Sequence, residues 1–118
     1  MEKGKHMRIH RYESNGGKDL ILDYIDRLNT PEKVDGYAVM ESLEAGRFDE
    51  LAIKTWRGKI SEVYFYKHNR LFYVIADGEN MYLLHACRKQ KNKTEKNDEE
   101  KIIKRAKELG LMLSKKFI

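Results

Sequence analysis

The sequence predicts an α+β fold in which an N-terminal strand and a helical hairpin precede an antiparallel β-meander and a C-terminal helix. Three observations predict it. Apolar residues between positions 18 and 45 recur with the period of an α-helix, and from Leu51 onward the period changes to two. Clusters of Gly, Asn and Asp then separate short runs of β-branched and aromatic residues. A chain of 118 residues is expected to form one domain, residues 1–118, with residues 1–6 flexible and without a function.

The N-terminal elements are a strand followed by two helices. The strand is expected at His6–Glu13, where apolar and polar residues alternate. In residues 18–29 the apolar side chains fall on one helical face. Thr30 is then expected to cap a second helix, with Pro31 in its first turn and Gly46 as its C-cap. The two helices are predicted to pack as an antiparallel hairpin that covers one face of the sheet.

The remaining elements are four strands and one helix. The strands are predicted at Leu51–Trp56, Ile60–Lys67, Arg70–Asp77 and Met81–Arg88, and residues 77–80 form a strong hairpin turn. Asn97 is expected to cap the last helix, with Glu100 at the reciprocal position and Gly110 at its end. The apolar tail after Gly110 is expected to dock on the domain or on a partner.

Charge is distributed in blocks along the chain. The net charge is +5, but residues 19–53 carry nine acids and three bases, whereas residues 54–93 carry nine bases and three acids. A concentrated basic field attracts polyanions and accelerates their encounter with the protein. The second half of the chain is therefore the candidate for nucleic-acid binding.

Composition also excludes several classes of protein. No stretch approaches 18 consecutive apolar residues, so no transmembrane helix and no membrane partner are expected. The N-terminus lacks an apolar signal region, and the single cysteine, Cys87, fits a reducing compartment, so a cytoplasmic location is predicted. No group of Cys and His residues has zinc-binding spacing, so no metal and no cofactor are expected. The sequence predicts no oligomeric state.

The predicted meander brings basic residues to one end of the sheet. In such a meander the end of the last strand lies beside the start of its partner, so Arg70 is expected next to Arg88 and Lys89. Lys67 joins them if Tyr64–Lys67 pairs with Arg70–Tyr73. The other basic residues expected near a bound phosphate are Lys54, Arg57, Lys91 and Lys93.

Three further residues have two interpretations each. His85 shares a face with Leu83 if the strand alternates regularly, which favours a buried structural histidine over a catalytic one. Glu62 is either a base near the site or the acid of a cross-strand salt bridge with Lys59 or Arg70. Tyr64 either packs in the core or orients a base or phosphate.

The order of elements and one long segment resemble the RelE/ParE toxin superfamily, most closely HigB-like toxins and related phage-derived proteins. The segment is "NRLFYVIADGENMYLLHACRKQKNKTEKNDEEKIIKRAKE", residues 69–108. Tyr64 stands where many relatives have an arginine, and Ala86-Cys87 replaces their Gly-Phe. The residues that match the pattern of the superfamily are Arg70, Leu83, Leu84, His85, Lys89, Lys93 and Thr94.

The resemblance implies the toxin of a type II toxin–antitoxin system. Its activity would be ribosome-dependent cleavage of mRNA, in which a ribose 2′-OH attacks the adjacent phosphate without a metal. This chemistry needs a base, an acid and cations that stabilise the phosphate. The implied partners are a cognate antitoxin and mRNA on the ribosome. The expected catalytic residues are Arg70, Lys89, Lys91 and Lys54, with Arg57, Lys67, Arg88 and Lys93 binding RNA.

Two alternative functions stay open. A ParE-like toxin that acts on DNA gyrase would keep the fold and use the helical hairpin as its binding surface. A non-catalytic protein that binds nucleic acid or an antitoxin is compatible with Tyr64 in place of the arginine of the superfamily. The cationic residues 89–93 favour the nuclease over the gyrase toxin.

Overall fold

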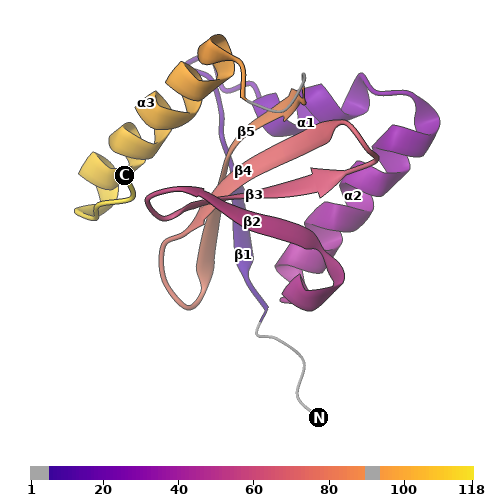
Figure 1. Ribbon diagram of the computed structural model, residues 1–118. Coiled ribbons are helices and arrows are strands. Elements are labelled where there is room, and N and C mark those ends of the chain that lie inside the picture. The colour runs from indigo at the N-terminus through magenta and orange to yellow at the C-terminus, as the bar shows by residue number, and fades with distance from the viewer. Residues whose placement is uncertain (1–5, 90–93) are drawn as a thin grey trace.

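A five-stranded sheet forms the centre of the computed structural model, which describes residues 6–89 and 94–118 (Figure 1). The order of the strands across the sheet is β1-β5-β4-β3-β2. Strands β2 to β5 form the predicted antiparallel meander, and β1 pairs with β5 in parallel. The predicted α+β fold is therefore confirmed. The strands are β1 (Arg8–Arg11), β2 (Ala52–Arg57), β3 (Ile60–Phe65), β4 (Asn69–Ile75) and β5 (Asn80–Arg88).

Helices cover both faces of the sheet. The predicted hairpin of α1 (Leu20–Asp26) and α2 (Thr30–Glu44) lies on one side, and α3 (Lys96–Leu113) lies on the other (Figure 1). Because side chains alternate along a strand, each face has its own apolar core. The core under the hairpin includes Ile21, Ile25, Leu43, Val63, Leu71 and Leu83, and the core under α3 includes Ile60, Phe72, Val74, Leu84, Ile102 and Ala106.

The start of α2 differs from the prediction by one residue. The N-cap is Asn29 and not Thr30, because the Asn29 side chain accepts the backbone N–H of Glu32 at 3.1 Å. Its amide also donates to Glu32 Oε1 at 3.0 Å, so the Asn29 side chain binds both the backbone and the side chain of Glu32. Gly36 allows close packing, since a Cβ atom there would lie 3.0 Å from the Phe65 ring and 3.1 Å from the Ile25 side chain. At the other end the C-cap is Ala45 and not Gly46, and Gly46 follows it with a φ of 73°, the left-handed conformation in which glycine often ends a helix.

The start and the end of α3 were also placed incorrectly. The N-cap is Glu95, which makes no side-chain capping bond, rather than Asn97. The helix continues through Gly110 to Leu113, and its C-cap, Ser114, is left-handed. Gly110 instead allows the chain to fold back, since a Cβ there would lie 2.5 Å from the carbonyl oxygen of Lys115. The packing between the tail and α3, rather than a helix stop, explains this glycine.

The tail docks on the domain, as expected. Phe117 is buried in the core under α3, and its carbonyl oxygen accepts the N–H of Lys59 at 2.8 Å. Gly58, in the turn between β2 and β3, has a φ of 53°, and a Cβ there would lie 2.5 Å from the same carbonyl oxygen. The turn and the tail therefore fit together only with glycine at this position.

One residue is inserted in β5 relative to β4. Phe72 pairs with His85 and Tyr73 pairs with Leu83, so Leu84 has no partner in the ladder. This bulge interrupts the alternation of β5. The predicted burial of His85 is confirmed, but the residue does not share a face with Leu83, as regular alternation predicted. His85 lies on the α3 side, whereas Leu83 belongs to the core under the hairpin.

Candidate functional site

Three cations surround the ring of Tyr64 on the α3 side of the sheet. The Nζ atoms of Lys54 and Lys89 lie 5.3 and 5.0 Å from the ring centroid, and the Arg70 guanidinium carbon lies 5.6 Å from it. Strand register explains the arrangement: Ala52, two residues before Lys54, pairs with Tyr64, and Tyr64 pairs with Arg70. We call Lys54, Tyr64, Arg70 and Lys89 the cationic cluster.

A buried ion pair lies beneath the cationic cluster. The Nε and Nη2 atoms of Arg70 lie 2.9 and 2.5 Å from Glu62 Oε2, and the two side chains are only 5% and 3% exposed. The Tyr64 hydroxyl donates to Glu62 Oε1 at 3.0 Å. The interpretation of Glu62 as the acid of a cross-strand salt bridge with Arg70 is confirmed. Glu62 therefore neutralises Arg70 and fixes the phenol of Tyr64, while Lys54 remains exposed and Lys89 is partly buried.

The other predicted basic residues lie apart from this cluster. Arg57 forms an ion pair with Glu99 of α3 at 2.9 Å. Arg88 donates to Glu32 of α2 at 3.0 Å, on the hairpin side of the sheet. Lys91 and Lys93 lie outside the described residues.

Lys67 was predicted to extend the strand, and that pairing is wrong. Strand β3 ends at Phe65, which pairs with Asn69, and Tyr64 rather than Lys67 lies opposite Arg70. Lys67 has a φ of 66° in the exposed turn that follows. Strand β3 ends two residues earlier than the hydrophobic pattern predicted, so the turn carries Lys67 out of the sheet.

His85 is held between two residues of α3. Its Nε2 atom lies 2.7 Å from Asp98 Oδ1, and its Nδ1 atom lies 2.9 Å from Arg105 Nη1. A guanidinium can only donate, so Nδ1 accepts and Nε2 carries the proton that is donated to Asp98. Burial lowers the pKa of His85, against the effect of Asp98, so the neutral form is favoured. Sequence reasoning missed Asp98 and Arg105, because residues 13 and 20 positions away carry no local signal of this contact.

Cys87 lies close to this network. The donor atoms of His85, Cys87 and Asp98 all lie within 4.8 Å of one another, which is the spacing of a possible metal site. However, a metal bound at Nε2 would leave a proton on Nδ1, directly opposite the Arg105 donor. Burial also raises the pKa of Cys87 to about 12, which disfavours the thiolate that binds metals. The three residues are therefore arranged for packing and hydrogen bonding.

A second polar network joins the hairpin to the sheet. Glu32 Oε2 accepts from the Asn69 amide and from Arg88, both at 3.0 Å, and the Tyr24 hydroxyl donates to Asn69 Oδ1 at 2.6 Å. The hydrogen bond from Asn69, and then the charge of Arg88, lower the pKa of Glu32. Burial raises the pKa of Tyr24 to about 12. Because Asn69 is adjacent to Arg70, this network anchors the strand end from which the cationic cluster is built.

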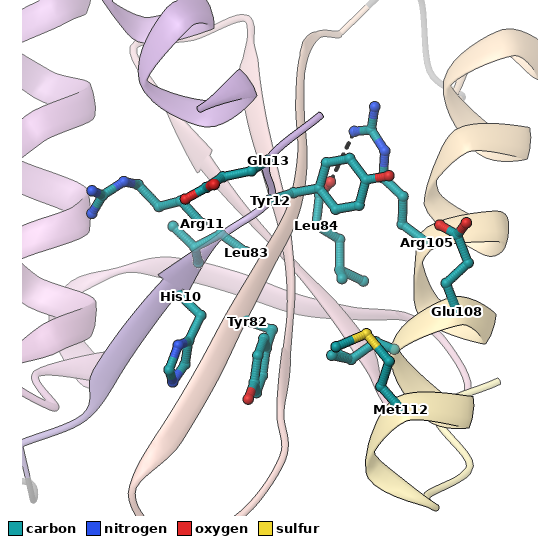
Figure 2. A pocket seen from close by; sticks show the side chains of 11 residues that line it. His10, Arg11, Tyr12, Glu13, Tyr82, Leu83, Leu84, Arg105, Glu108 and Met112 are labelled. Carbon is teal, nitrogen blue, oxygen red and sulfur yellow. Dashed lines mark hydrogen bonds between the residues drawn. The ribbon is translucent and has the colours of Figure 1, made fainter. Parts of the chain in front are cut away.

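A groove of about 350 Å³ lies between α3 and the strands β1 and β5 (Figure 2). The ring of His10 stacks on that of Tyr82 with centroids 4.4 Å apart, and Arg105 lies 4.1 Å from the Tyr12 ring. Figure 2 also shows Arg105 bonded to the Leu84 carbonyl oxygen, at 2.9 Å. The groove shares no lining residue with the cationic cluster, so it is a separate surface.

The strand order, with the helical hairpin on one face and the C-terminal helix on the other, defines a RelE-like fold. Residues 23–107 match the family model described as phage-derived protein Gp49-like (DUF891), and the chain belongs to that family. The family is part of the RelE/ParE-like toxin superfamily, which indicates a toxin of a toxin–antitoxin system and an antitoxin partner in general. The match does not assign the chain to the HigB-like branch.

No curated protein matches the sequence. Among residues 6–89 and 94–118, no helix has the length and apolar character needed to cross a membrane.

Proposed function

We propose that the protein is a HigB-like toxin that cleaves mRNA on the ribosome. In this reaction a ribose 2′-OH attacks the adjacent phosphate and the 5′-oxygen leaves, without a metal. The observation that supports it is the cationic cluster, which places Lys54 and Lys89 around Tyr64 on one face of the sheet. Such a cluster has the charge and the aromatic surface that bind a nucleotide.

Each residue of the cluster has a proposed role. Lys54 and Lys89 bind the phosphate and stabilise the charge that develops on it. Tyr64, whose hydroxyl is held by Glu62, orients the nucleotide. Arg70 is a positioning residue that acts through Glu62, because its own charge is neutralised and buried. Lys91 and Lys93 follow the cluster in sequence and remain predicted phosphate ligands.

The test compares two double variants with the wild type during induced expression. Lys54→Ala/Lys89→Ala removes two charges from the cluster, and Lys104→Ala/Lys107→Ala removes two exposed lysines of α3 as a matched control. Growth is followed, and the 5′ ends of cellular mRNA are mapped. The wild type and the control are expected to stop growth and to produce new cuts in translated messages, and the cluster variant to do neither while remaining folded.

Other outcomes identify the alternatives. Cuts that persist in the Lys54/Lys89 variant would reject the site, and arrest with DNA damage but without cuts would favour the gyrase toxin. The neutralised Arg70 specifically favours a third candidate, a non-catalytic RNA-binding protein. For that protein we expect RNA binding that weakens steeply with salt, with neither arrest nor cuts.

A further inference from the structure

Helix α2 has apolar side chains on two faces. Gly36, Val39 and Leu43 are buried beneath it. On its outer face, Val34 and Tyr37 are 63% and 42% exposed. A helix that covers a sheet normally presents polar residues to solvent, so a second apolar stripe calls for a separate explanation. The outer stripe consists of Pro31, Val34, Tyr37 and Ala38, all of which are exposed. Tyr37 and Ala38 lie three and four residues after Val34, and the exposed Glu41 follows Ala38 by three residues.

A neighbouring turn extends this stripe. The backbone N–H of Tyr66 donates to Asp35 Oδ2 at 2.7 Å, which holds the backbone of this turn against α2, and the Tyr66 side chain is exposed. The hydroxyl of Tyr37 donates to Asp26 of α1, so that ring is also held in place. Exposed apolar side chains that gather on one face are typical of a protein-binding site.

The charge around the stripe selects the kind of partner. Apart from Glu32, which is buried and paired with Arg88, residues 20–44 carry five acids and two bases, a net charge of −3 in a chain whose total is +5. Asp26, Asp35 and Glu41 lie beside or along the stripe. Complementary charge accelerates association and rejects partners of the wrong sign. The surface therefore fits an apolar segment that is flanked by lysine or arginine.

We propose that the outer face of α2 docks a cationic amphipathic helix of a partner protein. The apolar side chains of that helix pack along Pro31, Val34 and Ala38, and its basic residues face the surrounding acids. Membership of the family implies a protein partner, an antitoxin, in general terms. The inference does not depend on RNA cleavage, because α2 covers the sheet face opposite the cationic cluster.

The groove of Figure 2 is a weaker candidate for the same partner. Its rim carries both signs of charge, with Arg11 and Arg105 beside Glu13 and Glu108. The charge of the groove therefore favours neither a basic nor an acidic partner, whereas the acidic surroundings of α2 favour a basic one.

The test uses two synthetic helical peptides of about five turns with the same leucine stripe. One has lysine at every polar position and the other has glutamate. Each is titrated into the isotopically labelled full-length chain, and amide chemical shifts are recorded. The lysine peptide is expected to shift resonances of residues 30–44 and to bind at least about tenfold more tightly than the glutamate peptide, by about 1.4 kcal/mol. Added salt is expected to weaken it.

Matched variants locate the surface. Val34→Gln/Ala38→Gln keeps good helix formers on α2 and is expected to weaken the lysine peptide by at least about tenfold. Leu111→Gln/Met112→Gln changes two side chains of α3 that are 85% and 78% exposed, and is expected to leave binding unchanged. Circular dichroism checks that both variants are folded. Equal binding of the two peptides, shifts centred on α3 or on the cationic cluster, or unchanged binding by the α2 variant would each overturn the proposal.

Discussion

Replacing Glu62 with leucine should destabilise the fold far more than the loss of an ion pair at the protein surface does, because the Glu62–Arg70 pair is buried. The charged atoms of Glu62 and Arg70 are 2.5–2.9 Å apart. At 2.9 Å and an effective dielectric constant of about 20, their attraction is about 6 kcal/mol, and desolvation of both groups offsets most of it. Glu62→Leu removes the attraction but leaves the guanidinium of Arg70 in a site where it is 5% exposed. We expect a loss of about 3–5 kcal/mol in the free energy of unfolding.

The double variant Glu62→Leu/Arg70→Met should recover most of this loss. It fills a similar volume and leaves no buried charge, so its stability is expected within about 1 kcal/mol of the wild type. Urea unfolding of the wild type, both single variants and the double variant gives the coupling energy, expected at about 2–4 kcal/mol. A Glu62→Leu loss below about 1 kcal/mol, or losses that simply add in the double variant, would refute a buried and desolvated pair.

Three further predictions follow from the surroundings of α3. Because burial lowers the pKa of His85, the folded state resists protonation; stability is complete above the ordinary value of about 6.5 and falls as the pH drops below it. His85→Gln keeps a donor for Asp98 and an acceptor for Arg105 but does not titrate. In urea unfolding measured over a series of pH values, this variant should lose less stability below about pH 6.5 than the wild type does; an equal loss would assign the pH dependence to another group. Gly58→Ala should lower stability by about 2 kcal/mol or more, because the alanine adopts a left-handed conformation and its Cβ meets the Phe117 carbonyl oxygen. This loss should be smaller in a chain shortened after Ser114, and calorimetry of both sequences at position 58, each in the full-length and the shortened chain, would measure it. Cys87, whose pKa is raised to about 12, should not react with a thiol reagent at pH 8 until urea unfolds the protein, and rapid labelling of the native state would contradict its burial.

The meander and the meeting of Arg70 with Lys89 were predictable because both follow from local rules. The turn at residues 77–80 fixed where β4 and β5 reverse, and antiparallel pairing then placed the two residues at the same end of the sheet. The pairing of Glu62 with Arg70 was one of two interpretations, because opposite charges on neighbouring strands favour it. The sequence therefore predicted which residues, Glu62, Arg70 and Lys89, meet at one end of the sheet.

The ion pairs that the arginines form with acidic residues of the helices were harder to predict. Arg88 and Arg57 are predicted to bind RNA, and the structure pairs them with acids of α2 and α3 that the sequence did not indicate. Glu32 and Glu99 are separated from these arginines by 56 and 42 positions, and no periodicity connects such residues. The helix starts were misplaced for a related reason, since Asn29 and Thr30 are both good caps and only the tertiary fold decides between them.

The unpaired Leu84 divides β5 into two halves that serve different layers of the protein. Before it, Leu83 packs under the hairpin; after it, His85 and Cys87 face α3, and Lys89 emerges beside Tyr64. In a strand of uniform phase these later residues would exchange sides, so that Arg88 would emerge beside Tyr64 and Lys89 beside α2. A single extra residue thus determines which of two adjacent cations the surface offers to a nucleotide, so that loss of this residue would exchange the ammonium of Lys89 for the guanidinium of Arg88 without a substitution at either position.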